Sequence, residues 1–85
     1  MYKIDFGEYS GKKLYKLAEK DKKQAEAVSK VISKILNDPY HFKPLKKPMT
    51  GQRRAQIGAF VLTYSVDDEN KVVKILDYEH HDKVY

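Results

Sequence analysis

The stretch that most constrains the fold is residues 51–64, GQRRAQIGAFVLTY. After a glycine and two arginines, it places apolar side chains at alternate positions, namely Phe60, Leu62, Tyr64 and, just beyond, Val66. Because successive side chains of a strand point to opposite faces, this pattern predicts a strand with one face in a core. Val61, Thr63 and Ser65 would point the other way, so the second face is predicted to be the small, partly polar floor of a groove.

The middle of the chain carries basic residues without any acidic residue to neutralise them. The formal net charge is +5, and residues 39–66 contain no acidic residue but hold Lys43, Lys46, Lys47, Arg53 and Arg54. Such a surface favours a polyanion: nucleic acid, an anionic membrane surface or an acidic protein. A merely solvated surface is the alternative. The 85 residues contain no cysteine, which excludes disulfides, a thiolate nucleophile and cysteine-ligated zinc. A reducing cytoplasm fits this composition, and no apolar run approaches the roughly 20 residues that span a bilayer.

The first half of the chain predicts a strand and two helices. Residues 2–6, YKIDF, alternate in the manner of a half-buried strand. A helix is expected from residue 10 or 11 to about 20, and a second to about residue 36 with Asp21 as its N-cap. The second helix carries apolar residues at helical spacing, namely Val28, Val31, Ile32, Ile35 and Leu36. The short linker predicts an antiparallel helix hairpin.

The second half of the chain predicts a loop and an antiparallel sheet. Residues 39–52 hold all three prolines and form the loop. Strands are expected over residues 53–57, 60–66 and 71–78, the last apolar enough to be central. The fold class is therefore α+β: one domain, 1–85, with an N-terminal strand and a helix hairpin packed on a twisted, mainly antiparallel sheet.

Lysine and arginine supply most sequence-independent affinity for phosphates. Lys46, Lys47, Arg53 and Arg54 are the first candidates in this chain. Adjacent residues of a strand face opposite ways, so the two arginines are not both expected in one groove.

A second group of polar residues stands near the C-terminus: His80, His81, Asp82 and the final Tyr85. Histidine exchanges protons near neutral pH. The two histidines should point apart on an extended segment, so one alone is expected in the site. Further metal ligands are missing from the spacing and His41 is remote, so no metal is expected. A surface histidine bonded to Asp82, and a Tyr85 that only anchors the tail, are the structural alternatives.

Nearly the whole chain resembles the RelE/ParE family of small toxins from toxin–antitoxin operons, its RelE branch above all. The resemblance runs through YKIDF, NDPYHFKPLKK and GQRRAQIGAFVLTYSVDDENKVVKIL to the ending HHDKVY. It implies the RelE-like fold, a helix hairpin against a twisted antiparallel sheet. It also implies an endoribonuclease that inhibits translation by cleaving mRNA in the ribosomal A site, through attack by the RNA's own 2′-hydroxyl and without metal or other cofactor.

The resemblance also implies partners and site residues. A cognate acidic, RelB-like antitoxin would hold the toxin in a hetero-oligomer, and the ribosome with bound mRNA would be its target, in the cytoplasm and away from membranes. Arg54 matches a basic residue near the scissile phosphate. Tyr85 matches a C-terminal tyrosine that activates the nucleophile, and His81 stands where many members have arginine. Residues expected to contact RNA are Lys43, Lys46, Lys47, Arg53 and His80.

Two positions depart from the family's pattern. Gln56 stands where arginine or lysine is usual, and Val61 replaces the arginine of a common Tyr-Arg-Val/Leu motif, here Phe60-Val61-Leu62. Loss of one such charge contact commonly costs about 10²–10³ in rate. These departures keep two alternatives open: a non-catalytic binding module with the toxin fold, and a ParE-like inhibitor of gyrase.

Overall fold

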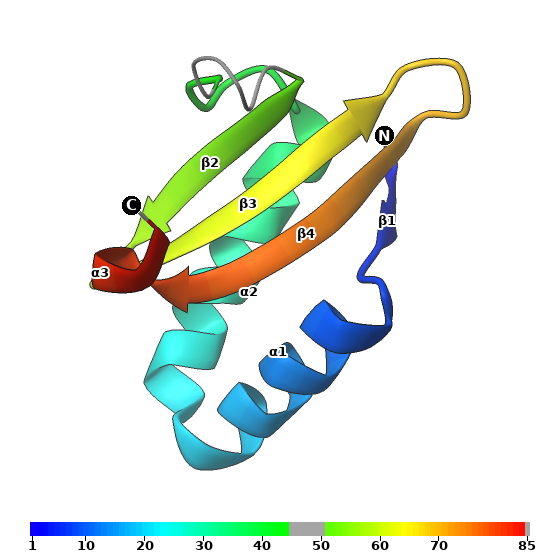
Figure 1. Ribbon diagram of the computed structural model, residues 1–85. Helices are drawn as coiled ribbons and strands as arrows, with labels where there is room; N and C mark the ends of the chain where they lie inside the picture. The colour runs from blue at the N-terminus through cyan, green and yellow to red at the C-terminus, as the bar shows by residue number, and fades with distance from the viewer. Residues whose placement is uncertain (45–50, 85) are drawn as a thin grey trace.

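The computed structural model describes residues 1–44 and 51–84 (Figure 1). Its elements in chain order are β1 (Lys3–Asp5), α1 (Glu8–Lys20), α2 (Lys22–Asn37), β2 (Gln52–Ile57), β3 (Phe60–Asp67), β4 (Val72–His80) and α3 (His81–Val84). The predicted strand, two helices and three further strands are thereby confirmed within a few residues. The short C-terminal helix α3 was not expected.

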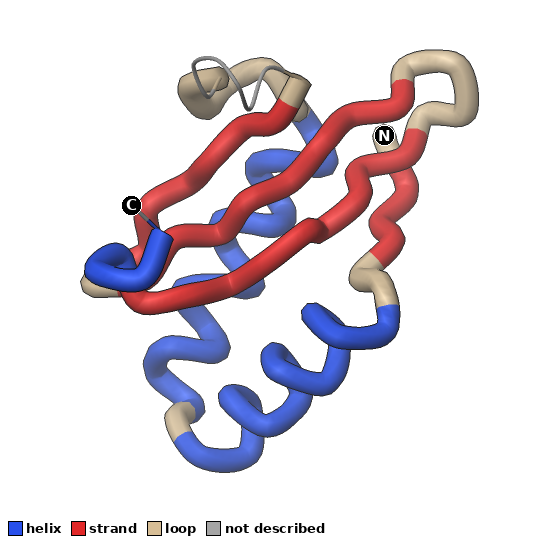
Figure 2. The backbone as a smooth tube through the Cα atoms, in the orientation of Figure 1, coloured by secondary structure: helices blue, strands red, loops and turns tan. Residues whose placement is uncertain are grey.

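The four strands form one sheet in the order β1-β4-β3-β2. β1 runs parallel to β4, and the other two pairs are antiparallel. The α2 helix lies behind the sheet, and α1 lies beside the half of β4 that β1 leaves unpaired (Figure 2). The predicted α+β class and the central place of β4 are confirmed. Within the described ranges, no helix is long and apolar enough to cross a membrane.

Asp21 ends one helix and begins the next. Its backbone N–H donates to the Leu17 carbonyl oxygen at 2.8 Å, and its carboxylate accepts from the Gln24 N–H at 3.1 Å. This is the N-cap that the sequence predicts. The α1 helix begins earlier than expected, at Glu8, because Gly7 takes a positive φ of 67° and turns the chain directly after β1.

The core lies between α2 and the sheet. Its buried members are Val28, Ile35, Ala55, Ile57, Leu62, Tyr64, Val73, Ile75 and Tyr78. Phe60 and Val66 pack at its margin, so the apolar face predicted for β3 is confirmed. The hydroxyl of Tyr64 donates to the Pro39 carbonyl oxygen at 2.8 Å, and burial raises the pKa of this phenol to about 12.

A β-bulge in β4 sets which of its side chains face the core. Thr63 pairs with Asp77, while Tyr64 pairs with Ile75, so Leu76 is an extra residue between them. The bulge allows Ile75 and Tyr78 to face the same core despite their odd spacing. The hydroxyl of Ser10, on α1, donates to the Leu76 carbonyl oxygen at 2.9 Å and so satisfies the bulged backbone.

The carboxylate of Asp68, in the β3–β4 turn, joins three segments that are distant in the sequence. The hydroxyl of Tyr2 donates to Oδ1 of Asp68 at 2.6 Å, and the hydroxyl of Tyr40 donates to Oδ2. These two hydrogen bonds hold the pKa of Asp68 below its ordinary value, and the same carboxylate raises the pKa of Tyr2 to about 12. The N-terminus and the segment after α2 are thereby fastened to the β3–β4 turn.

This carboxylate predicts a pH-dependent stability. Because the pKa of Asp68 is lowered in the folded state, its stabilisation is complete above the ordinary carboxyl pKa of about 3.9 and is lost as the pH falls through the lowered value. Asp68→Asn should therefore reduce the free energy of unfolding at pH 7, and its difference from the parent should shrink in acid. Urea unfolding between pH 7 and pH 2 measures this, with the exposed neighbour Glu69→Gln as control. A difference that stays constant with pH would contradict the assignment.

Candidate functional site

The face of the sheet opposite α2, called here the open face, carries rows of cross-strand paired residues, two of which lie nearest to α3. Arg54, Thr63 and Asp77 form one row across β2, β3 and β4, and Gln56, Val61 and Glu79 form the next. The α3 helix stands in front of the sheet, where β4 ends (Figure 1). The candidate site comprises this face, α3 and the neighbouring surface of α1.

Arg53 and Arg54 point to opposite faces of the sheet, as their adjacent positions in the sequence predict. Arg53 turns toward the α2 side, where its Nη1 donates to the Phe42 carbonyl oxygen at 2.8 Å and its guanidinium lies 4.7 Å from the Tyr40 ring centre. It is thus engaged within the fold, although the sequence made it a candidate for RNA. Arg54 lies on the open face, and its N–H donates to the Lys43 carbonyl oxygen at 3.2 Å.

Arg54 lines a shallow depression of about 300 Å³ at the β2 edge. Its other lining residues are His41, Phe42, Lys43 and Gln56. Two expected basic residues, Arg54 and Lys43, therefore meet here. Lys46, Lys47 and Tyr85 lie outside the described residues.

The expectation that Val61 reaches an open groove is wrong. Its side chain does point away from the α2 core, but only 1% of the residue is exposed, and Thr63 beside it is 7% exposed. Val61 sits between two longer cross-strand neighbours, Gln56 and Glu79. Gln56 is exposed, so it is the departure from the family pattern that still faces solvent.

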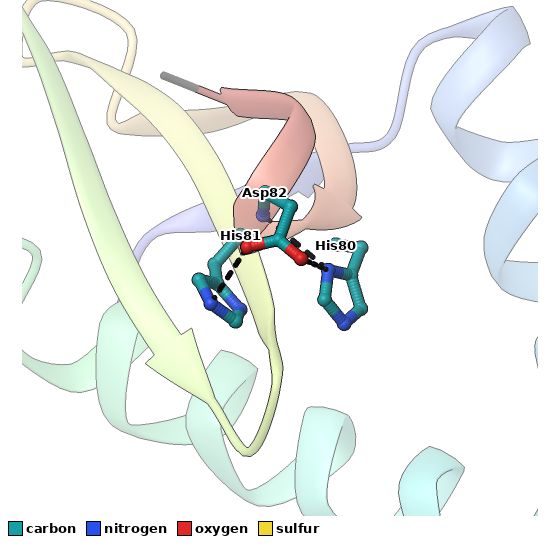
Figure 3. Close-up of side chains that lie close together, drawn as sticks. All are labelled: His80, His81 and Asp82. Atoms are coloured by element: carbon teal, nitrogen blue, oxygen red, sulfur yellow. Dashed lines mark hydrogen bonds and ion pairs between the residues drawn. The ribbon is translucent and has the colours of Figure 1, made fainter.

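The two histidines lie side by side, whereas the sequence predicted that they point apart. Their ring centres are 4.7 Å apart and the rings are inclined by 29° (Figure 3). The reason is that the chain turns into α3 at His81 instead of continuing as an extended strand. The His81 N–H donates to the Ala59 carbonyl oxygen at 2.9 Å, and its Nδ1 lies 3.1 Å from the same oxygen.

Asp82 contacts both histidines with one carboxylate. Its Oδ1 lies 3.0 Å from Nε2 of His81, and its Oδ2 lies 3.5 Å from Nδ1 of His80 (Figure 3). His80 also packs edge-on against Phe60, with ring centres 5.5 Å apart. Both rings are therefore held by neighbours, while 39% of the His80 side chain and 51% of the His81 side chain stay exposed.

A basic groove lies beside α1, and its lining residues on that helix were not among the site residues predicted from the sequence. A depression of about 540 Å³ between α1 and the end of β4 is lined by Lys13, Lys16, Leu17, Lys20, Phe60, Tyr78, Glu79 and His80. Its lysines follow i, i+3, i+7 spacing, which places them on one helix face and is the signal that would have found them. Lys13 is itself paired, with Asp77 at 3.1 Å and with Glu79. Lys16 and Lys20 therefore carry the charge most available to a ligand.

Arg54 and His80 lie on opposite faces of the sheet and at different levels along it, because their partners on β3, Thr63 and Phe60, are an odd number of residues apart. Arg54 pairs with Thr63, and His80 pairs with Phe60 three residues back along β3. At about 3.3 Å per residue the two levels are roughly 10 Å apart. A bound polyanion contacts both only if it runs along the strands and passes around the end of the sheet. The arrangement offers charge for phosphates at one level and an imidazole for proton transfer at the other.

Comparison with known proteins gives a consistent result. The family model described as "ParE toxin of type II toxin-antitoxin system, parDE" matches residues 10–85. A Methanocaldococcus jannaschii protein that bears the name toxin RelE4 is 38% identical over 86 aligned residues, which cover all of this chain and 92% of that protein.

Solved structures share the fold. The RelBE2 toxin–antitoxin complex from Mycobacterium tuberculosis contains a chain with a TM-score of 0.78 and 28% identity, over 94% of this chain and 98% of that one. The isolated E. coli RelE toxin has a TM-score of 0.81 and 23% identity, over 94% of this chain and 84% of that one. The helix pair on a four-stranded sheet is thus the arrangement of these toxins.

The burial of Val61 predicts how the open face tolerates arginine. Val61→Arg would place a guanidinium at a position 1% exposed, so it should lower the free energy of unfolding by at least about 3 kcal/mol. Gln56→Arg, on the same face and paired with Val61, should change it by no more than about 0.5 kcal/mol. Urea unfolding of both variants measures the contrast. Equal stability of the two would show that position 61 opens readily to solvent.

Proposed function

Because this chain belongs to the RelE/ParE family of type II toxin–antitoxin toxins, we propose that it inhibits translation by cleaving mRNA in the ribosomal A site. The observation that carries the proposal is the imidazole of His81, which the Ala59 carbonyl oxygen orients at the end of the sheet on whose open face Arg54 lies. A protein with this target acts in the cytoplasm. The reaction is a transfer within the RNA, so it needs no cofactor.

In the proposed reaction, the 2′-hydroxyl of one nucleotide attacks the adjacent phosphorus, and the 5′-oxygen of the next nucleotide leaves. Nδ1 of His81 faces the Ala59 carbonyl oxygen, which accepts only, so Nδ1 carries the proton of the neutral ring. Nε2 then has the lone pair. It lies 3.0 Å from Asp82 Oδ1, so the exposed Asp82 carboxylate must turn aside before Nε2 accepts the proton of the attacking hydroxyl. Tyr85 is the second proton-handling group, by its match to the family's terminal tyrosine.

The basic residues hold the substrate in this proposal. Arg54 neutralises charge on the phosphate, which grows as the 2′-oxygen attacks. Lys43 beside it, together with Lys46, Lys47 and His80, binds the flanking backbone. Arg53 contributes through its contacts with Tyr40 and Phe42, which hold the segment that carries Lys43 against β2.

A non-catalytic binding module is the second candidate. It is favoured by the absence of a basic side chain at Gln56 and Val61, and by two acids, Asp77 and Glu79, on the open face. Such a protein would occupy the ribosome or its antitoxin without cleaving RNA. A ParE-like gyrase inhibitor is third, because it would share the fold without needing these residues; a supercoiling assay separates it from the other two.

Cleavage assays on selected variants test the nuclease proposal. The double change His81→Ala with Tyr85→Phe should lower mRNA cleavage in a translating extract by about 10²–10⁴, because general acid–base catalysis contributes that much. Arg54→Ala should lower it by about 10²–10³. Gln56→Arg should raise it, because an added guanidinium would line the same depression as Arg54.

Lys30→Ala, on the exposed surface of α2, is the control and should cleave like the parent. Ribosome co-sedimentation of each variant separates loss of chemistry from loss of binding. If neither the parent nor Gln56→Arg cuts mRNA, the binding module becomes the better assignment. If the double variant cuts like the parent, the proton-handling groups have been placed wrongly.

The groove beside α1 is the proposed binding site for the antitoxin. An acidic, partly disordered partner fits it, because Leu17, Phe60 and Tyr78 offer apolar contact while Lys16 and Lys20 offer charge at the rim. The M. tuberculosis relative was solved as a toxin–antitoxin complex, which supports a hetero-oligomer here as well. Occupation of this groove would also bring the antitoxin against His80.

Charge reversal on this rim should weaken the complex. Lys16→Glu with Lys20→Glu should reduce antitoxin affinity by at least tenfold, and the parent's affinity should fall with rising salt. Lys22→Glu with Lys30→Glu, exposed positions outside the groove, changes the net charge equally and serves as the control. Isothermal titration measures both. Equal loss in the two double variants would mean that net charge, and not this groove, governs binding.

A further inference from the structure

Three side chains converge where β4 passes into α3. One possible ligand atom from each of His80, His81 and Asp82 lies within 4.8 Å of the other two (Figure 3). We propose that these residues form a binding site for one divalent transition metal ion of the zinc class. The sequence predicted no metal here, because its spacing supplies no third and fourth ligand and His41 is remote.

The distances suit a metal of this size. Zinc binds imidazole nitrogen at about 2.0–2.1 Å and carboxylate oxygen at about 2.0–2.2 Å, so neighbouring ligands in a tetrahedron lie about 3.3 Å apart. Asp82 Oδ1 lies 3.0 Å from His81 Nε2, and Asp82 Oδ2 lies 3.5 Å from His80 Nδ1. These two distances involve different oxygens of Asp82, and a set of one atom from each residue spans up to 4.8 Å, so rotation of the exposed side chains has to bring the ligands together.

A positive charge between His81 Nε2 and the Asp82 carboxylate would stabilise their arrangement. Nδ1 of His81 faces the Ala59 carbonyl oxygen, and Nε2 faces the Asp82 carboxylate, and both oxygens only accept. In the neutral ring, the Nε2 lone pair would therefore point at a carboxylate. His80 differs, because its Nδ1 lone pair already accepts from the Asp82 N–H at 3.3 Å, with Oδ2 at 3.5 Å; a metal there would replace this long hydrogen bond. At His81, either a second ring proton or a metal cation satisfies the two acceptors.

The surroundings favour a metal site of defined geometry. A metal-binding histidine usually donates its other ring N–H to a carbonyl or carboxylate, and Ala59 supplies that oxygen to His81. Phe60 supports the ring of His80 from the side. Imidazole with carboxylate selects zinc, nickel and copper over magnesium and calcium, and three protein ligands leave one position for water.

One consequence rests on the proposed function. A metal on Nε2 of His81 occupies the atom proposed to accept the proton of the 2′-hydroxyl. Bound metal would therefore inhibit cleavage, and a chelator would restore it. Metal binding itself does not depend on this consequence, because it requires only the three side chains.

Isothermal titration of chelator-treated protein with ZnCl₂, without RNA or ribosomes, tests the site. The parent should bind one Zn²⁺ per chain, and His80→Ala, His81→Ala and Asp82→Asn should each weaken binding at least tenfold. His41→Ala is the matched control, because it removes the remaining histidine, whose ring packs on Phe42, and should leave the affinity unchanged. Acid should weaken binding, since protons compete for the imidazoles.

Cobalt adds a readout of geometry. Co²⁺ in place of Zn²⁺ should give the intense visible absorption of a tetrahedral complex in the parent and lose it in Asp82→Asn. Circular dichroism of each variant checks that the fold persists; if His81→Ala unfolds, Asp82→Asn, on a side chain 74% exposed, carries the test. Absence of stoichiometric binding by the parent, or an equal loss in His41→Ala, would overturn the proposal. If the protein binds Zn²⁺ but does not cleave mRNA, the result contradicts the proposed function and leaves the metal site standing.

Discussion

Burial of one face of β3 against α2 is the constraint on which the rest of the structure depends. Leu62 and Tyr64 are fully buried, and burial of one such side chain contributes about 1.5–3 kcal/mol. Both neighbouring strands take their register from β3, and the Tyr64 hydroxyl holds Pro39, where the chain leaves α2. With that face committed to the core, chemistry is left to the opposite face and to the ends of the strands.

The candidate site follows from the way β4 fits this constraint. The extra residue at Leu76 keeps the side chains on both sides of the bulge in the core and sets His80 opposite Phe60 at the end of β3. The chain then meets the β2–β3 turn, where the Ala59 carbonyl oxygen faces both the N–H and Nδ1 of His81. One backbone oxygen thus starts α3 and orients an imidazole, which is why two neighbouring histidines share one carboxylate.

Local patterns predicted the elements, and contacts between distant segments escaped them. The period of α2, the Asp21 cap and the alternation along β3 are all properties of neighbouring residues. The alternation along β3 predicted correctly that the Val61 side chain points away from the α2 core, but it did not predict that this side chain is buried. Hydrogen bonds between Asp68 and Tyr2 or Tyr40 leave no period in the sequence. The histidine pair was misjudged for the same reason, since a distant carbonyl oxygen decides that the chain turns at residue 81.

The central claim is that this chain cuts ribosome-bound mRNA through the RNA's own 2′-hydroxyl. The most direct measurement is the chemistry of the new RNA ends when purified protein meets one mRNA, either free or engaged by stalled ribosomes. The mechanism predicts cuts at the A-site codon of the ribosome-bound RNA, with a 2′,3′-cyclic phosphate on the upstream fragment and a 5′-hydroxyl on the downstream one. A 5′-phosphate on the downstream fragment, equal cutting of free RNA, or no cutting at all would contradict it.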